Sequence, residues 1–131
     1  MRKDEFIFLD TSRANVDNGK TKHRGLELEW RYAATETLTI IGAGTVARHT
    51  YSNDPALART PVSGNLIDTS PKTMGSVSLD WQLGERFSQQ ITWTHMGRYY
   101  TDPANTNEYP GHDLIHWHGQ FDLNEDLTLF F

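Results

Sequence analysis

The chain of 131 residues contains no cysteine, which excludes disulfide bonds and thiolate metal sites. It has no apolar run that approaches the roughly 18 residues of a membrane-spanning helix, and its mean hydropathy is -0.62. A net charge of -5 without any basic run argues against nucleic acid as a partner. These absences exclude a helical membrane protein. They leave open a soluble domain and a transmembrane β-barrel, whose strands are only half apolar.

What the chain does contain is a long alternation of polar and apolar residues from Thr73 to Tyr100, interrupted by a tight turn at residues 84–86. A period of two is typical of a strand with one apolar face. Each half keeps its alternation for ten or more residues, whereas strands in soluble domains mostly have about 5 to 6. We therefore predict a long antiparallel hairpin. Its apolar face holds Val77, Leu79, Trp81, Leu83, Phe87, Ile91, Trp93 and Tyr99.

Further strands are predicted by similar alternation at residues 5–11, 21–33, 38–51, 112–123 and 127–131. In the 38–51 strand, the adjacent Ile40 and Ile41 leave open which face is apolar. Long connections at 12–20, 52–72 and 101–111 alternate strictly with short ones at 35–37, 84–86 and 124–126. Outer-membrane barrels place their long loops on one rim and their tight turns on the other. The predicted fold is all-β: an antiparallel up-and-down meander of about 6–7 long strands, an open arc of a larger transmembrane β-barrel.

Several aromatic residues on the apolar parity stand close to the short turns. Transmembrane barrels flank their lipid-facing band with aromatic girdles, so we predict a lipid-facing girdle near the tight-turn rim, on the periplasmic side. Its predicted members are Trp30, Tyr32, Trp81, Phe87 and Phe121. The alternative is that these residues are ordinary strand aromatics, which any sheet favours.

Three stretches together resemble TonB-dependent outer-membrane receptors. The first is NGKTKHRGLELE at residues 18–29, with RGLELE as its most specific part. The others are MGRYYTD at 96–102 followed by YPGH at 109–112, and FDL at 121–123 followed by LTL at 127–129. The resemblance implies a barrel in the bacterial outer membrane that imports a scarce nutrient, most often a ferric siderophore. It also implies the lipid bilayer as surroundings and the TonB system as partner, through a plug domain.

The chain departs from that family pattern in several respects. No plug domain, TonB box or signal peptide is recognised in it, and the closing strand of the family is missing. Only five residues follow the last predicted turn, fewer than the about 9 to 11 that span a bilayer. A full receptor closes roughly 22 strands. We therefore expect residues 1–131 to be a partial β-barrel domain, an internal fragment of a longer receptor.

If the receptor interpretation holds, the ligand meets the long loops and the upper lumen. Arginine and tyrosine suit an anionic, aromatic ferric chelate through charge and stacking. The predicted ligand-binding residues are Arg48, Tyr51, Arg59, Arg98, Tyr100, Tyr109 and His112. Each of them taken singly is equally well explained as a solvated loop residue.

Histidines on one parity of the 112–123 strand suggest a second kind of site. His116 and His118 are close enough along the strand to approach one ion, and His112 shares their face. A barrel lumen is polar in any case, so we predict no metal site there. No nucleophile with a base, phosphate-binding glycine loop or HExxH pattern appears. We accordingly predict no catalysis and no cofactor.

Two other classes compete with the receptor fragment. One is a soluble antiparallel β-sandwich or small barrel that binds a carbohydrate or a lipid. The low hydropathy and the acidity of the chain fit this class as well as they fit the receptor fragment. The other is a complete small outer-membrane barrel, which needs an eighth strand that the sequence does not supply. An apolar belt that requires detergent would separate the membrane classes from the soluble one.

Overall fold

The computed structural model describes residues 2–9, 15–55 and 60–131. All regular structure within these ranges is β, and no helix there is long and apolar enough to cross a membrane. The strands are β1 (Arg2–Leu9), β2 (Asn15–Ala33), β3 (Leu38–Tyr51), β4 (Thr73–Leu83), β5 (Phe87–Met96), β6 (Tyr99–Tyr100), β7 (Glu108–Tyr109), β8 (His112–Asn124) and β9 (Leu127–Phe130).

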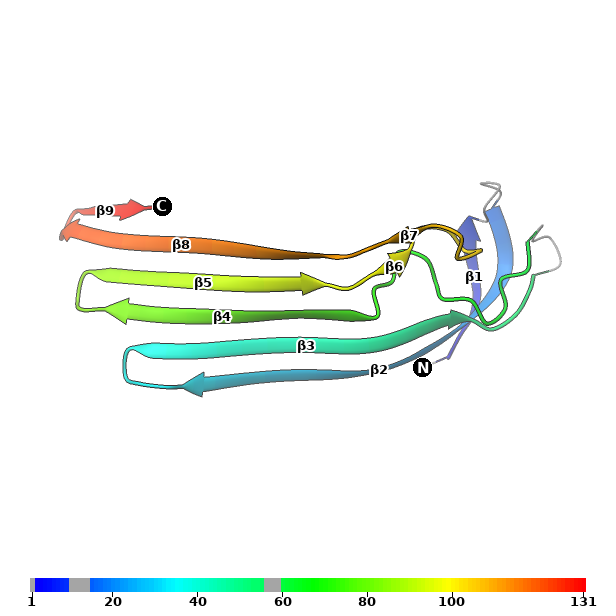
Figure 1. Cartoon of the computed structure of the whole chain (residues 1–131), viewed down its shortest axis with the longest axis horizontal. Helices are drawn as coiled ribbons and strands as arrows, with labels where there is room; N and C mark the ends of the chain where they lie inside the picture. Colours follow the sequence, from blue (N-terminus) through cyan, green and yellow to red (C-terminus); the bar gives the residue numbers. More distant parts are fainter. Residues whose placement is uncertain (1, 10–14, 56–59) are drawn as a thin grey trace. The chain divides into compact units, whose positions relative to one another are not determined.

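Seven of these strands form one sheet in the order β1-β2-β3-β4-β5-β8-β9, so that the long strands follow one another as in a meander (Figure 1). β6 and β7 form a separate two-stranded ribbon. Within the described residues, β1 and β9 are the edges of the large sheet, which is therefore open. The predicted all-β antiparallel meander is confirmed. A sandwich would need a second large sheet, and these ranges contain none.

Two predicted boundaries are wrong. β2 begins at Asn15, although residues 12–20 were expected to be a loop, because β1 pairs with this polar stretch from Arg2↔Lys22 to Leu9↔Asn15. Pairing with a neighbouring strand outweighs turn-forming composition here. Residues 10–14 lie outside the described ranges, and so does the end of the strand predicted at 5–11.

The second difference concerns the end of the hairpin that the sequence placed at residues 73–100. β5 ends at Met96, and Gly97 then lies against Thr73, with its N–H donating to the Thr73 carbonyl at 2.8 Å. A Cβ at Gly97 would overlap the Thr73 side chain, so this close approach requires glycine. Beyond it the chain leaves the large sheet, and Tyr99–Tyr100 becomes β6 of the small ribbon.

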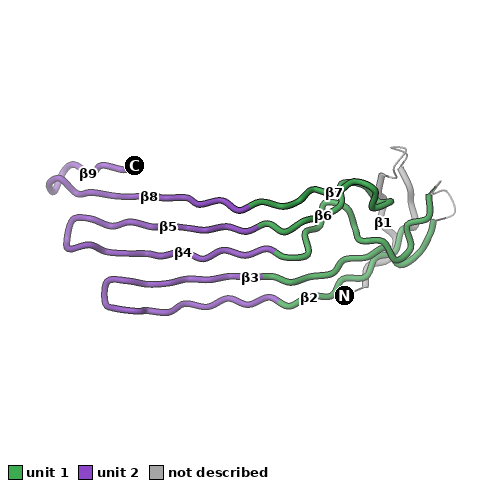
Figure 2. Tube along the Cα trace, viewed as in Figure 1, with its two compact units in different colours: residues 1–26, 45–73, 96–112 green, residues 27–44, 74–95, 113–131 purple. Residues whose placement is uncertain are grey.

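The chain divides into two compact units (Figure 2). Unit 1 comprises residues 1–26, 45–73 and 96–112, and unit 2 comprises residues 27–44, 74–95 and 113–131. The long connections after β3 and within residues 101–111 belong to unit 1. The tight turns after β2, β4 and β8 belong to unit 2, which matches the predicted separation of long loops from tight turns.

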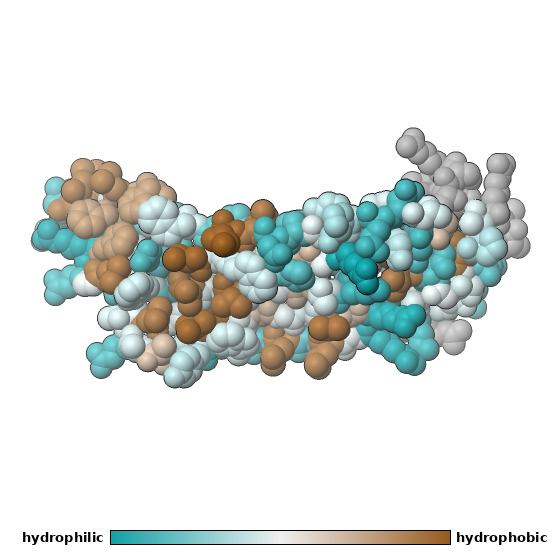
Figure 3. Space-filling view, in the orientation of Figure 1, coloured by the Kyte–Doolittle hydropathy of each residue, from teal (hydrophilic) through white to brown (hydrophobic). Residues whose placement is uncertain are grey.

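Most large apolar side chains of the strands are exposed. Leu28 is 63% exposed and Ile115 is 75% exposed, and Figure 3 shows apolar side chains gathered over the strands of unit 2. The buried apolar residues are few among the described ones: Tyr51 and Val62, both in unit 1. Nothing among the described residues covers these exposed apolar side chains. We therefore expect folding to depend on an apolar medium around the sheet.

Candidate functional site

The two long connections of unit 1 are joined by a side-chain clamp at Asn105. Its amide oxygen accepts from the Leu66 N–H at 2.8 Å, and its amide nitrogen donates to the Leu66 carbonyl at 2.9 Å. Asn105 itself has a φ of 59°, in the left-handed region that asparagine tolerates better than most residues. Thr69 also donates its N–H to the Tyr100 carbonyl at 2.8 Å. The residues after β3 and those around β6 and β7 thus form one hydrogen-bonded surface.

The ribbon of β6 and β7 gathers aromatic and charged side chains on this surface. The rings of Tyr99 and Tyr109 lie 5.1 Å apart, and the Tyr109 hydroxyl is 2.8 Å from Nδ1 of His112. Arg98 lies 3.6 Å from the Glu108 carboxylate, with its own side chain 64% exposed. A cation, hydroxyls and an imidazole therefore share one small region. Such a set can bind an anionic, oxygen-rich molecule.

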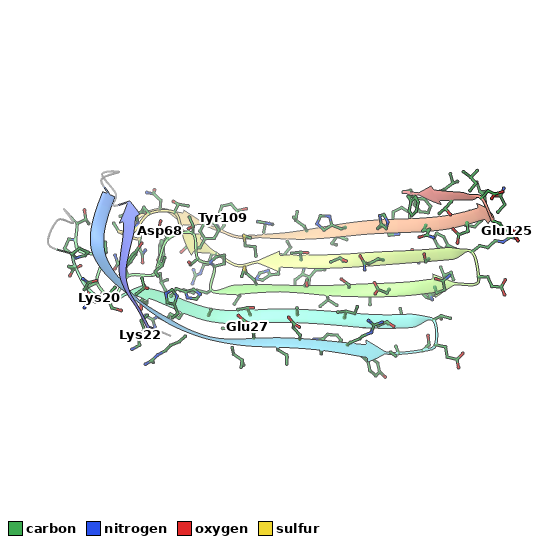
Figure 4. The ribbon with its side chains drawn as sticks, turned by 180° about the vertical axis from the view of Figure 1, so that it is seen from behind. Lys20, Lys22, Glu27, Asp68, Tyr109 and Glu125 are labelled. Carbon is green, nitrogen blue, oxygen red and sulfur yellow. The ribbon has the colours of Figure 1, made fainter. Side chains whose placement is uncertain are left out.

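The predicted ligand residues do not all meet there. Tyr100 lies in the same ribbon, in β6. Tyr51 is buried and donates its hydroxyl to Asp68 at 2.5 Å, in the part of unit 1 where Figure 4 labels Asp68. Arg48 is exposed and lines a groove together with Arg24, whereas Tyr51 does not line that groove. Arg59 lies outside the described residues.

A histidine pair that the sequence did not single out lies on β2 and β3 of unit 1. Nδ1 of His23 and Nδ1 of His49 are 2.7 Å apart, so one nitrogen donates and the other accepts. Nε2 of His23 is 3.0 Å from the hydroxyl of Thr21, which is buried. Across the described ranges no group of three or more His, Cys, Asp or Glu is arranged to hold a metal ion. The pair thus forms a polar contact between neighbouring strands.

Asp102 organises the turn between β6 and β7. Its carboxylate accepts from the N–H of Asn107 at 2.7 Å, from the N–H of Thr106 at 3.0 Å and from the Thr106 hydroxyl at 3.0 Å. Partial desolvation raises the pKa of Asp102, but hydrogen bonds from Asn107, Thr106 and Ala104 outweigh it and leave the pKa below the ordinary 3.8. The turn is thus held by the ionised form.

We expect the order of this turn to depend on pH. Because the folded pKa is lowered, the stabilisation is complete well above pH 3.8 and is lost as the pH falls through the folded value. A nitroxide attached at Ala104→Cys in the complete receptor is expected to keep one mobility from pH 7 to 5 and to become more mobile below 3.8. Asp102→Asn is expected to be mobile across the whole range. A wild-type label that is mobile at pH 7 would contradict this role.

The predicted girdle residues all belong to unit 2. Tyr32 is 60% exposed, Trp30 and Trp81 are each 43% exposed, and Phe121 is 37% exposed. Phe87 is half-buried, with its ring 6.4 Å from that of Phe121. Four of the five predicted girdle residues are thus exposed, and Phe87 is not.

Long antiparallel strands, exposed apolar side chains at alternate positions, and loops segregated from turns define the wall of a transmembrane β-barrel. The family described as TonB dependent receptor-like, beta-barrel matches residues 1–131. The chain belongs to this family of receptors and transporters, and its location is the bacterial outer membrane.

Named relatives are consistent with that assignment. The chain is similar to the ferrichrome outer membrane transporter/phage receptor of Escherichia coli (strain K12), with 26% identity over 113 residues, which cover 83% of this chain and 14% of that protein. The solved receptor for ferric yersiniabactin, FyuA from Yersinia pestis, shares the fold with a TM-score of 0.77 and 18% identity, over 89% of this chain and 18% of its own.

The ferric citrate transporter FecA also shares the fold, with a TM-score of 0.72 and 22% identity, over 92% of this chain and 20% of its own. This chain therefore spans a fifth or less of the length of these proteins.

Proposed function

We propose that the chain forms part of the barrel of a receptor that takes up a ferric siderophore across the outer membrane. The observation that carries this proposal is the match of the receptor family to the whole chain, together with relatives named for ferrichrome, ferric yersiniabactin and ferric citrate. Energy reaches such a receptor through TonB and a plug domain. Residues 1–131 then contribute one arc of the wall, and the role is transport rather than catalysis.

Within this role, the loop surface of unit 1 meets the ligand. Tyr100 and Tyr109 on the ribbon, with Arg98 and His112 beside it, supply a cation, aromatic faces and polar groups. Ferric chelates are commonly anionic, and arginine suits them because its charge is permanent and its planar group donates several hydrogen bonds. The exposed aromatics of unit 2 serve as the lipid-facing girdle.

Arg98→Ala in the complete receptor is expected to weaken uptake. Removing an exposed cation that contacts an anionic ligand costs about 1 kcal/mol, which is roughly a fivefold rise in the ligand concentration for half-maximal uptake. Uptake of radioactive iron as ferric citrate, which is anionic, by iron-starved cells measures it. Deletion of the receptor gene gives the baseline.

The matched control is Glu108→Gln, which breaks the same 3.6 Å ion pair but leaves the arginine cation in place. We expect this variant to take up iron like the wild type. Equal losses in both variants would assign Arg98 a structural role. If deletion of the receptor gene left the uptake of every ferric chelate unchanged, the transport function itself would be contradicted.

A further inference from the structure

The ribbon of β6 and β7 has two faces with different chemistry. Tyr99 pairs directly with Tyr109 across the ribbon, and Tyr100 pairs with Glu108. Because neighbouring strand residues point to opposite faces, the first pair lies on one face and the second pair on the other. Arg98 lies 3.6 Å from the Glu108 carboxylate and so belongs with the second pair. One face of the ribbon therefore carries two aromatic rings, and the other carries the charges.

The aromatic face extends from the ribbon to His112, the first residue of β8. The rings of Tyr99 and Tyr109 lie 5.1 Å apart at an interplanar angle of 36°, and the ring of His112 meets that of Tyr109 edge-on at 5.9 Å. Figure 4 labels Tyr109 on this ribbon. All three side chains are half-buried, so part of each stays accessible. Together they form an aromatic platform.

The aromatic platform also offers a hydrogen-bond donor. The Tyr109 hydroxyl lies 2.8 Å from Nδ1 of His112. A hydroxyl that donates to Nδ1 leaves the proton of a neutral imidazole on Nε2. Nε2 then donates to an oxygen of a bound molecule. A molecule that carries both an aromatic ring and oxygen atoms matches these two features.

We propose that Tyr99 is a specificity-determining residue: through the aromatic platform, the receptor binds ferric chelates that carry aromatic rings more tightly than aliphatic chelates of equal charge. Aromatic rings attract one another in offset-stacked or edge-to-face arrangements beyond the effect of their apolar area, and a saturated group lacks this attraction. The charges lie on the other face of the ribbon, so this selection does not depend on the charge of the chelate. The inference rests on the proposed uptake function and adds Tyr99, which the sequence patterns did not single out as a ligand residue.

The test compares two neutral ferric chelates, tris(benzohydroxamato)iron and tris(cyclohexanecarbohydroxamato)iron, which bind iron through the same groups and differ in whether the attached ring is aromatic. Equilibrium dialysis of radioactive iron against the complete receptor in detergent measures their affinities, and receptor-free micelles give the baseline. We expect the wild type to bind the aromatic chelate roughly tenfold more tightly, since one aromatic contact contributes up to this factor. In Tyr99→Leu the preference is expected to fall to about twofold or less, because an apolar side chain without a ring replaces the tyrosine.

Tyr99→Phe keeps the ring and is expected to keep the preference. The matched control is Tyr100→Leu, the same substitution one residue further along, on the charged face of the ribbon. It is expected to leave the ratio of the two affinities at the wild-type value. If the wild type bound the two chelates equally or bound neither, or if both leucine variants lost the preference alike, the inference would be overturned. None of these results contradicts the proposed uptake, which deletion of the receptor gene tests separately.

Discussion

Leu28→Arg in the complete receptor is expected to destabilise the barrel by about 2–4 kcal/mol, the cost of a cation on the lipid face near the bilayer midplane. Leu28 is 63% exposed and lies between Leu26 and Trp30 on the apolar face of β2. In a bilayer this exposed side chain meets hydrocarbon, where an arginine loses most of its hydration. The urea midpoint for folding into phospholipid vesicles measures the loss.

Glu29→Arg provides the matched control, because it introduces the same side chain one residue further along β2. Neighbouring strand residues point to opposite faces, so this arginine lies on the polar face. We expect its urea midpoint to stay close to that of the wild type. A control variant as damaged as Leu28→Arg would mean that the lipid face is wrongly assigned.

Gly111→Ala is expected to cost about 3 kcal/mol, because two penalties act together. Gly111 has a φ of 88°, which side chains with a Cβ rarely adopt. A Cβ here would also overlap the Met96 carbonyl oxygen and lie 2.9 Å from the carbonyl carbon of Gly97. The backbone between β7 and β8 must therefore shift. That Cβ would also lie 3.0 Å from the backbone nitrogen of Arg98, so faster trypsin cleavage after Arg98 in the complete receptor reports this shift.

Gly64→Ala separates the two penalties. Gly64 has a similar φ of 85°, but a Cβ there would meet no atom within 4 Å. We expect only the conformational cost of about 1–2 kcal/mol and no faster cleavage after Arg98. Equal destabilisation by the two substitutions would refute the argument from close backbone approach.

The proposed ligand surface could be predicted only in part from the sequence. Tyrosine and arginine near a long connection indicated Tyr100 and Tyr109, which lie in the ribbon of β6 and β7, and Arg98, which precedes β6 and pairs with Glu108 of β7. Asn105 gave no signal, because its clamp on Leu66 joins residues 39 positions apart. Nearness in sequence predicts that Arg48 and Tyr51 contribute to one ligand-binding region. Arg48 and Tyr51 are three positions apart on β3, so alternation places them on opposite faces of the strand and in different surroundings.

The face of β3 illustrates the same limit. Adjacent isoleucines at 40 and 41 make the sequence ambiguous, since neither parity is wholly apolar. A Cβ at Gly42 would overlap the indole ring of Trp30, so Gly42 and Trp30 share one face of unit 2. By alternation Ile40 lies on this face and Ile41 on the other. Only the neighbouring strand could decide this.

The amino-acid sequence is enough to predict the all-β class, the long strands, the separation of long loops from tight turns, and the family. These features are local, because a period of two and the placement of turn residues can be read along a single strand. The tertiary structure alone decided where β2 begins, which face β3 presents, how the ribbon of β6 and β7 leaves the sheet, and which rings share one face of that ribbon. Each of these depends on backbone pairing or close approach between residues far apart in the chain, and a pattern read along one strand contains no information about its neighbour.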